Sequence, residues 1–179
     1  MKKSILATTV LALMISGSAL ANEGAYVGGS LGSAKLDPSN DSTATSFGAY
    51  GGYNFTDWFG IESSLFATTE FKQGDGVEVM GAAFSVAPRF ILTLNEEFSL
   101  FAKAGLANTL VNVDTPIGDT DFDGIVFSWG VGLDWSVGEH LGLRLAYEMN
   151  DGELEHEDFS SVDVDVELSQ LYLGVHYHF

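Results

Sequence analysis

The chain of 179 residues contains no cysteine, only three prolines, and seven lysines and arginines against 25 aspartates and glutamates. Without cysteine it has neither a disulfide framework nor a thiolate nucleophile. A formal net charge of −18 argues against nucleic-acid binding, because the phosphate backbone requires a basic surface. After the first 21 residues, no apolar run has the roughly 20 residues of a membrane-spanning helix. These absences exclude a disulfide scaffold, a thiol enzyme, a nucleic-acid-binding protein and a helical membrane protein.

The N-terminus has the pattern of a secretory signal peptide. Lys2 and Lys3 precede an apolar run over residues 5–15, and Ala19-Leu20-Ala21 supplies small residues for a signal peptidase. The sequence therefore predicts a cleaved signal peptide over 1–21 and one mature domain over 22–179. Asn22, where a lipid-anchored protein would have cysteine, argues against a lipid anchor.

The C-terminus alternates strictly between two kinds of residue, which predicts a β-strand. One face carries Leu173, Val175, Tyr177 and Phe179, and the other carries Tyr172, Gly174, His176 and His178. A terminal aromatic residue, preceded by a spaced aromatic and a glycine, resembles the C-terminal insertion signal of bacterial outer-membrane β-barrels. The resemblance gives Gly174, Tyr177 and Phe179 this role and implies recognition by the barrel-assembly machinery.

Eight segments have the composition of strands: 24–36, 45–55, 58–71, 77–92, 98–112, 124–136, 140–150 and 161–179. The connections alternate between short ones, at 56–57, 93–97 and 137–139, and mostly longer polar ones, at 37–44, 72–76, 113–123 and 151–160. Short turns on one side and long polar loops on the other are typical of outer-membrane barrels. The sequence thus predicts an all-β fold, an eight-stranded antiparallel up-and-down transmembrane β-barrel in the outer membrane of a Gram-negative bacterium.

Alternation within the strands assigns large apolar residues to the outer face and charged residues to the interior. Aromatic residues gather near the short turns, as in an interfacial girdle: Phe55, Trp58, Phe59, Phe90, Phe98, Trp135, Tyr177 and Phe179. Pro88 cannot donate to the strand ladder, so a bulge or a local break in pairing is expected there.

Three acids and three bases are predicted to point into the lumen: Glu62, Arg89, Lys103, Asp134, Arg144 and Glu148. The interior of an eight-stranded barrel is just wide enough for side chains to fill it. Charges in that space must be paired, because an isolated buried charge is costly. The six residues either fill and rigidify the barrel or form a charge gate in a narrow pore.

At this point the chain resembles the transmembrane domain of the OmpA-type family of small outer-membrane barrels. The resemblance is carried by Tyr26-Val27-Gly28-Gly29-Ser30-Leu31-Gly32, Gly51-Gly52-Tyr53-Asn54-Phe55, Gly60-Ile61-Glu62, Lys103-Ala104-Gly105, Val131-Gly132-Leu133-Asp134-Trp135 and Leu143-Arg144-Leu145. It implies a salt-bridge network across the lumen. Ser30 stands where the family often has an inner lysine, and the family's peptidoglycan-binding domain is missing, which makes the chain similar to the short members of the class.

The longer connections concentrate carboxylates. Asp119, Asp121 and Asp123 alternate before Gly124, as in the first half of a calcium-binding loop. The match then fails, because the twelfth position counted from Asp119 is Gly130 instead of a bidentate glutamate. The segment is therefore either a solvated loop or part of an acidic rim that binds calcium or magnesium weakly and collectively. No other cofactor is expected.

No arrangement of nucleophile and base stands out, so an enzyme is not predicted. Ser160 and Ser161 lie near His156, but their spacing carries no catalytic pattern. The predicted role is structural or one of surface interaction through the acidic loops. The expected partners are outer-membrane lipids, lipopolysaccharide and the assembly machinery, with no nucleic acid among them. The alternative is a small porin-like channel for ions or small solutes, gated by the lumen charges.

Overall fold

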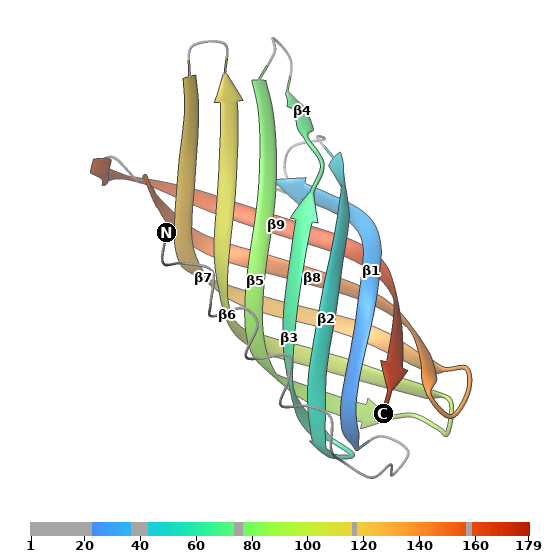
Figure 1. Ribbon diagram of the computed structural model, residues 1–179. Helices are drawn as coiled ribbons and strands as arrows, with labels where there is room; N and C mark the ends of the chain where they lie inside the picture. Colours follow the sequence, from blue (N-terminus) through green and yellow to red (C-terminus); the bar gives the residue numbers. More distant parts are fainter. Residues whose placement is uncertain (1–22, 37–42, 74–76, 116–117, 157–158) are drawn as a thin grey trace, which may run out of the picture.

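The computed structural model describes residues 23–36, 43–73, 77–115, 118–156 and 159–179, so the predicted signal peptide lies outside the described residues. The described residues contain strands and turns (Figure 1). The strands are β1 (Gly24–Leu36), β2 (Thr43–Thr56), β3 (Phe59–Thr68), β4 (Phe71–Gln73), β5 (Val77–Thr93), β6 (Phe98–Thr115), β7 (Gly118–Ser136), β8 (Leu141–His156) and β9 (Phe159–His178). Within these ranges there is no helix that could cross a membrane.

The strands form one closed antiparallel sheet. Strands that follow one another along the chain pair, except β3 with β4, and β1 also pairs with β9, from Tyr26 opposite His178 to Leu36 opposite Leu168. The short β4 continues the direction of β3, and both pair with β5, so they form one strand of the barrel wall. The predicted eight-stranded up-and-down barrel is therefore confirmed.

A β-bulge separates β3 from β4. Pairing with β5 places Ala67 opposite Ala82 and then Phe71 opposite Val79, so three residues oppose two. The bulge reverses the alternation: Phe66 in β3 and Phe71 in β4 are both buried, although one has an even and the other an odd number. The prediction of one regular strand over 58–71 was therefore wrong at its outer end, where it would have turned Phe71 outward.

The outer face is apolar, as the alternation predicted. Side chains that are exposed around the wall include Leu31, Leu65, Phe84, Leu106, Ile125, Leu145 and Leu173. Aromatic rings meet near the short turns, with ring centroids 5.6 Å apart for Phe59 and Phe90 and 5.7 Å apart for Phe98 and Trp135. The wall thus carries a lipid-compatible belt with an aromatic border at the end where the chain terminates.

Pro88 interrupts one ladder without shifting it. In the ladder between β5 and β6, Val86 pairs with Leu106. The next pair is Arg89 with Lys103, in the same register. A Cβ atom on Gly105 would lie 2.7 Å from the Cα atom of Ala87, so glycine permits this close approach of the two backbones. The predicted local break at the proline is confirmed.

At the other end, long β-ribbons replace two predicted loops. β6 and β7 pair up to Thr115 opposite Gly118, and β8 and β9 pair up to His156 opposite Phe159. β6, β7 and β9 have 18, 19 and 20 residues. Since about 9–11 residues cross a bilayer, these ribbons project roughly 20 Å beyond it. The loops predicted over 113–123 and 151–160 were wrong over 113–115, 118–123, 151–156 and 159–160, where the residues belong to strands; 116–117 and 157–158 lie outside the described residues.

The three aspartates of the predicted cation loop lie in one of these ribbons. Asp119, Asp121 and Asp123 lie in β7 and pair with Asp114, Asn112 and Leu110 of β6. A calcium loop needs a turn that gathers alternate side chains around one ion, whereas a strand spaces them along its length. The predicted loop is thus a strand at these three positions, and divalent-cation binding by Asp119, Asp121 and Asp123 stays a prediction.

Candidate functional site

The interior of the barrel contains a buried network of charges. The six side chains predicted to face the lumen are between 1% and 8% exposed. They come from five strands: Glu62 from β3, Arg89 from β5, Lys103 from β6, Asp134 from β7, and Arg144 and Glu148 from β8. The structure brings all six together, with three charges of each sign.

Glu62 is the centre of this network. One carboxylate oxygen, Oε1, lies 2.9 Å from Nζ of Lys103, and the other, Oε2, lies 2.6 Å from Nη1 of Arg144. The hydroxyl of Tyr26 donates a hydrogen bond of 2.6 Å to Oε2, and Nε of Arg89 lies 3.8 Å from the same oxygen. Three cations and a hydroxyl thus compensate the desolvation of one carboxylate.

Asp134 joins the two arginines on the side of the short turns. Nε and Nη2 of Arg144 donate to its two carboxylate oxygens at 2.7 Å and 3.1 Å, which is the bidentate geometry that arginine favours. Arg89 forms an ion pair with the same carboxylate and donates to the side-chain oxygen of Asn54 at 3.3 Å. Asp134 therefore fixes the orientation of both guanidinium groups.

Glu148 ends the network on the side of the ribbons. One of its oxygens, Oε2, lies 2.9 Å from Nζ of Lys103. The other accepts hydrogen bonds of 3.2 Å from the hydroxyls of Ser64 and Ser85. The network thus runs along the lumen from Asp134 to Glu148 through alternating signs, and its formal charges sum to zero.

Aromatic rings complete the cross-section around the arginines. The guanidinium carbon of Arg144 lies 4.2 Å from the ring centre of Tyr50 and 4.4 Å from that of Phe101, and Arg89 lies 4.4 Å from Phe101. The hydroxyl of Tyr50 lies 3.1 Å from Nδ1 of His176. Reasoning from charges alone missed these rings and Tyr26, although their places at inward positions of the alternation would have revealed them.

The predicted C-terminal signal residues divide between the two faces of β9. Tyr177 and Phe179 are exposed on the outer face, with ring centres 5.2 Å apart. Gly174 is buried inside, where a Cβ atom would lie 2.6 Å from the hydroxyl of Tyr50. The last strand therefore presents its aromatic side to the surroundings, and its role as an insertion signal stays a prediction.

The ribbon of β8 and β9 places like charges opposite one another. Its register pairs Asp151 with Glu167, Glu153 with Asp165, and Glu155 with Asp163. Asp123 of β7 is in turn opposite Glu155. Like charges directly opposite in a ladder are destabilising. Among the described residues, no group of three or more His, Asp or Glu side chains is arranged to hold a metal ion.

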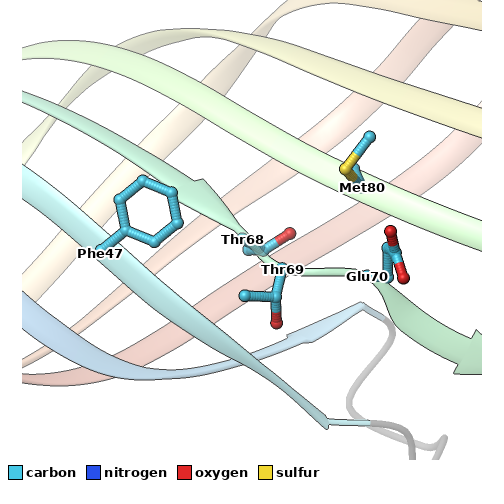
Figure 2. A pocket seen from close by; sticks show the side chains of 5 residues that line it. All are labelled: Phe47, Thr68, Thr69, Glu70 and Met80. Atoms are coloured by element: carbon cyan, nitrogen blue, oxygen red, sulfur yellow. The ribbon is translucent and has the colours of Figure 1, made fainter.

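An open groove lies on the outside of the bulge between β3 and β4 (Figure 2). It has a volume of about 500 Å³ and is lined by Phe47, Thr68, Thr69, Glu70 and Met80. The bulge is secured by two hydrogen bonds: Gly81 N–H donates to the hydroxyl of Thr68 at 2.9 Å, and Thr69 N–H donates to the carbonyl of Thr45 at 2.8 Å. The groove lies on the outer side of the bulge, and the side chain of Phe71, just after the bulge, is buried on the inner side.

Comparison with known proteins places this fold in a family. The model of the outer membrane protein β-barrel domain matches residues 6–179. No curated protein matches the chain in sequence. Neisserial surface protein A (NspA) is 18% identical, with a TM-score of 0.71, over 88% of this chain and 100% of that one.

Two further solved structures show the same fold. OprG from Pseudomonas aeruginosa is 15% identical, with a TM-score of 0.64, over 88% of this chain and 97% of that one. Ail, the attachment invasion locus protein of Yersinia pestis, is 19% identical, with a TM-score of 0.59, over 87% and 96%. The match of the family model over nearly the whole chain shows that the protein belongs to the outer membrane protein β-barrel domain family.

Proposed function

We propose that this outer-membrane barrel has a surface-interaction role and that its projecting acidic ribbon, β8 and β9 beyond the membrane, binds cations and cationic groups. The observation that carries the proposal is the register of the ribbon, which pairs three carboxylates with three others. The two carboxylates of each pair repel one another. A cation that binds between the strands reduces this repulsion and stabilises the ribbon.

The anionic lipopolysaccharide of an outer-membrane surface attracts such cations. Lipopolysaccharide is anionic, and calcium or magnesium ions bridge it to a carboxylate surface by weak, collective binding. Asp123 and Asp151 are exposed, and Asp123 of β7 adds a further carboxylate opposite Glu155 of the ribbon. The ribbon then holds divalent cations together with the lipid phosphates that share them. Oxygen ligands of this kind suit both ions.

The neighbours support a role at the cell surface but not a shared ligand. Ail is named for attachment and invasion, and one of its structures contains the heparin analogue sucrose octasulfate. The ribbon of this chain has the opposite preference, because its paired carboxylates repel a sulfated polyanion. A basic protein segment or a cation-bridged lipopolysaccharide fits this charge.

The alternative role, a porin-like channel gated by the lumen charges, has no observation in its favour. The six charged side chains are buried, and aromatic rings pack against the two arginines. In an eight-stranded barrel, side chains of this size fill the interior.

The experiment compares binding to lipopolysaccharide at rising calcium concentration. The refolded protein is held in nanodiscs of zwitterionic lipid, and bound lipopolysaccharide is measured with calcium and with a chelator. The test variant is Glu153→Gln/Glu155→Gln/Asp165→Asn, which removes three charges from the ribbon. The control variant is Glu96→Gln/Glu97→Gln/Glu139→Gln, which removes three exposed carboxylates from the short turns at the opposite end.

The proposal expects calcium-dependent binding by the unmodified protein and by the control variant, and a loss of most binding in the ribbon variant. Equal binding by all three proteins, or binding that survives the chelator, would overturn it.

A further inference from the structure

The open groove on the outside of the bulge lies where the wall of the barrel leaves the hydrocarbon of the membrane. β3 has 10 residues, from Phe59 at the short turn to Thr68 at the groove. About 9–11 residues cross a bilayer, so the strand reaches the lipid head groups at this point. Phe47 and Met80, which are 52% and 38% exposed, lie on the two sides of the groove (Figure 2). The groove is therefore continuous with the lipid-facing belt.

Beside the groove, two alanines carry only methyl groups between larger side chains. Phe47 is opposite Ala67, Ala67 is opposite Ala82, and Ala82 is opposite Leu110. Both alanines are half-buried, whereas Leu110 is 46% exposed. The volume of the groove, about 500 Å³, falls within the roughly 300–1,000 Å³ of small-molecule sites. The wall thus leaves room for an acyl chain between Phe47 and Leu110, with its polar end in the groove.

The polar rim of the groove is fixed in position by backbone donors. The hydroxyl of Thr68 accepts a hydrogen bond of 2.9 Å from the N–H of Gly81, and the hydroxyl of Thr69 accepts one of 3.1 Å from the N–H of Thr45. A hydroxyl that accepts one bond keeps its own proton to donate. Because Thr69 is exposed, its O–H group is available to an oxygen atom of a bound molecule.

Glu70 gives this rim a negative charge. It is exposed, and it forms no ion pair with the described side chains. The nearest base along the chain, Lys72, is placed opposite Glu78 by the ladder of β4 and β5. A carboxylate accepts hydrogen bonds from an ammonium group and repels an anionic head group. The rim therefore favours a lipid whose head combines N–H donors with oxygen acceptors.

We propose that this groove binds one phospholipid with an ethanolamine head group, with an acyl chain between Phe47 and Leu110 and the ammonium group on Glu70. Thr69 donates to an ester or phosphate oxygen of the same lipid. Other common head groups fit less well, because phosphatidylcholine has no N–H donor and phosphatidylglycerol has no cation. The inference concerns the wall formed by β2, β3 and β5, and it does not depend on the role of the ribbon.

The methionines provide a local reporter and an internal control. Of the four, Met1 and Met14 lie in the predicted signal peptide, which leaves two in the refolded mature chain. Met80 lines the groove, and Met149 lies in β8, away from it. The methyl groups of labelled methionine are observed by NMR in phosphatidylcholine nanodiscs, while phosphatidylethanolamine is added in increasing proportion. Phosphatidylglycerol and lipopolysaccharide are added in parallel samples.

The expected result is a shift of the Met80 signal that saturates with phosphatidylethanolamine, whereas the Met149 signal does not saturate. Glu70→Gln, a change at an exposed position, is expected to weaken this binding by about two- to fivefold, the range for an exposed ion pair. Ala82→Leu, which places a larger side chain on the path of the acyl chain, is expected to abolish saturation. Asp151→Asn is the matched control, because it removes an exposed carboxylate of the ribbon and leaves the groove intact.

Three outcomes would overturn the proposal. A Met80 shift that rises without saturation for every lipid would mean that only bulk lipid contacts the groove. Equal saturation by phosphatidylglycerol, or unchanged affinity in Glu70→Gln, would refute the contact between the ammonium group and Glu70. Saturation by lipopolysaccharide and not by phosphatidylethanolamine would refute the ethanolamine head group.

Discussion

Replacing Arg144 by methionine tests the charge network most directly. The guanidinium group donates two hydrogen bonds to Asp134 and one to Glu62, all between 2.6 and 3.1 Å. Methionine keeps most of the volume and removes the charge, which leaves three acids and two bases in the lumen. Both carboxylates retain another cation, Arg89 or Lys103. Breaking a buried pair in this way costs about 3–5 kcal/mol.

The assay is urea unfolding of the refolded protein in lipid vesicles, followed by the fluorescence of its three tryptophans. With a slope of about 1–3 kcal/mol per molar urea, a loss of this size lowers the unfolding midpoint by roughly 2 M. The double variant Arg144→Met/Asp134→Asn restores the balance of charge and is expected to recover part of the loss, since the uncompensated carboxylate is gone.

Lys35→Met is the control, because it removes a half-buried lysine at the outer end of β1. A change of less than about 1 kcal/mol is expected there, as for a partly exposed charge. If Arg144→Met lowered the midpoint no more than Lys35→Met does, the network would not be a structural element of the barrel.

Three further outcomes follow from the packing. Gly105→Ala should destabilise the barrel by about 1–3 kcal/mol in the same assay, because its Cβ would meet the backbone at Ala87, whereas Gly138→Ala, with open space around it, should be neutral. Tyr26→Phe should cost about 1.5–3 kcal/mol, the range for a hydrogen bond to a charged group; a change under 0.5 kcal/mol would refute that bond. Phe179→Ser should reduce the amount of protein in the outer-membrane fraction of cells while leaving the refolded barrel nearly as stable; equal amounts in cells would refute the insertion signal.

Most of the fold could be predicted because a lipid-facing wall imposes a strict alternation. Each strand of a small barrel has apolar residues on one side and small or charged residues on the other, so the period of two remains visible along the chain. The same alternation placed Glu62 and Arg144 inside, and the narrow lumen required them to be paired. Here one physical constraint determined both the architecture and the facing of the residues.

The ribbons and the bulge could not be predicted in the same way. Outside the membrane the alternation no longer has to be apolar, so the acidic residues around Asp121 and Glu155 resemble a loop although they are in strands. The bulge at Thr68 to Glu70 depends on one extra residue relative to β5, and no local pattern marks it. The aromatic rings around the arginines were missed because the lumen residues were selected from the sequence by their charge alone.

The distribution of the lumen charges over five strands has a consequence for how the protein assembles. Glu62 and Arg144, which are 2.6 Å apart, are separated by 82 residues in the chain. An incomplete sheet, growing strand by strand in the bilayer, would expose these charges to hydrocarbon before their partners arrived. The polar side would therefore have to stay in contact with water until β1 meets β9. Pairing of these charges therefore stabilises the closed cylinder relative to an open sheet in lipid.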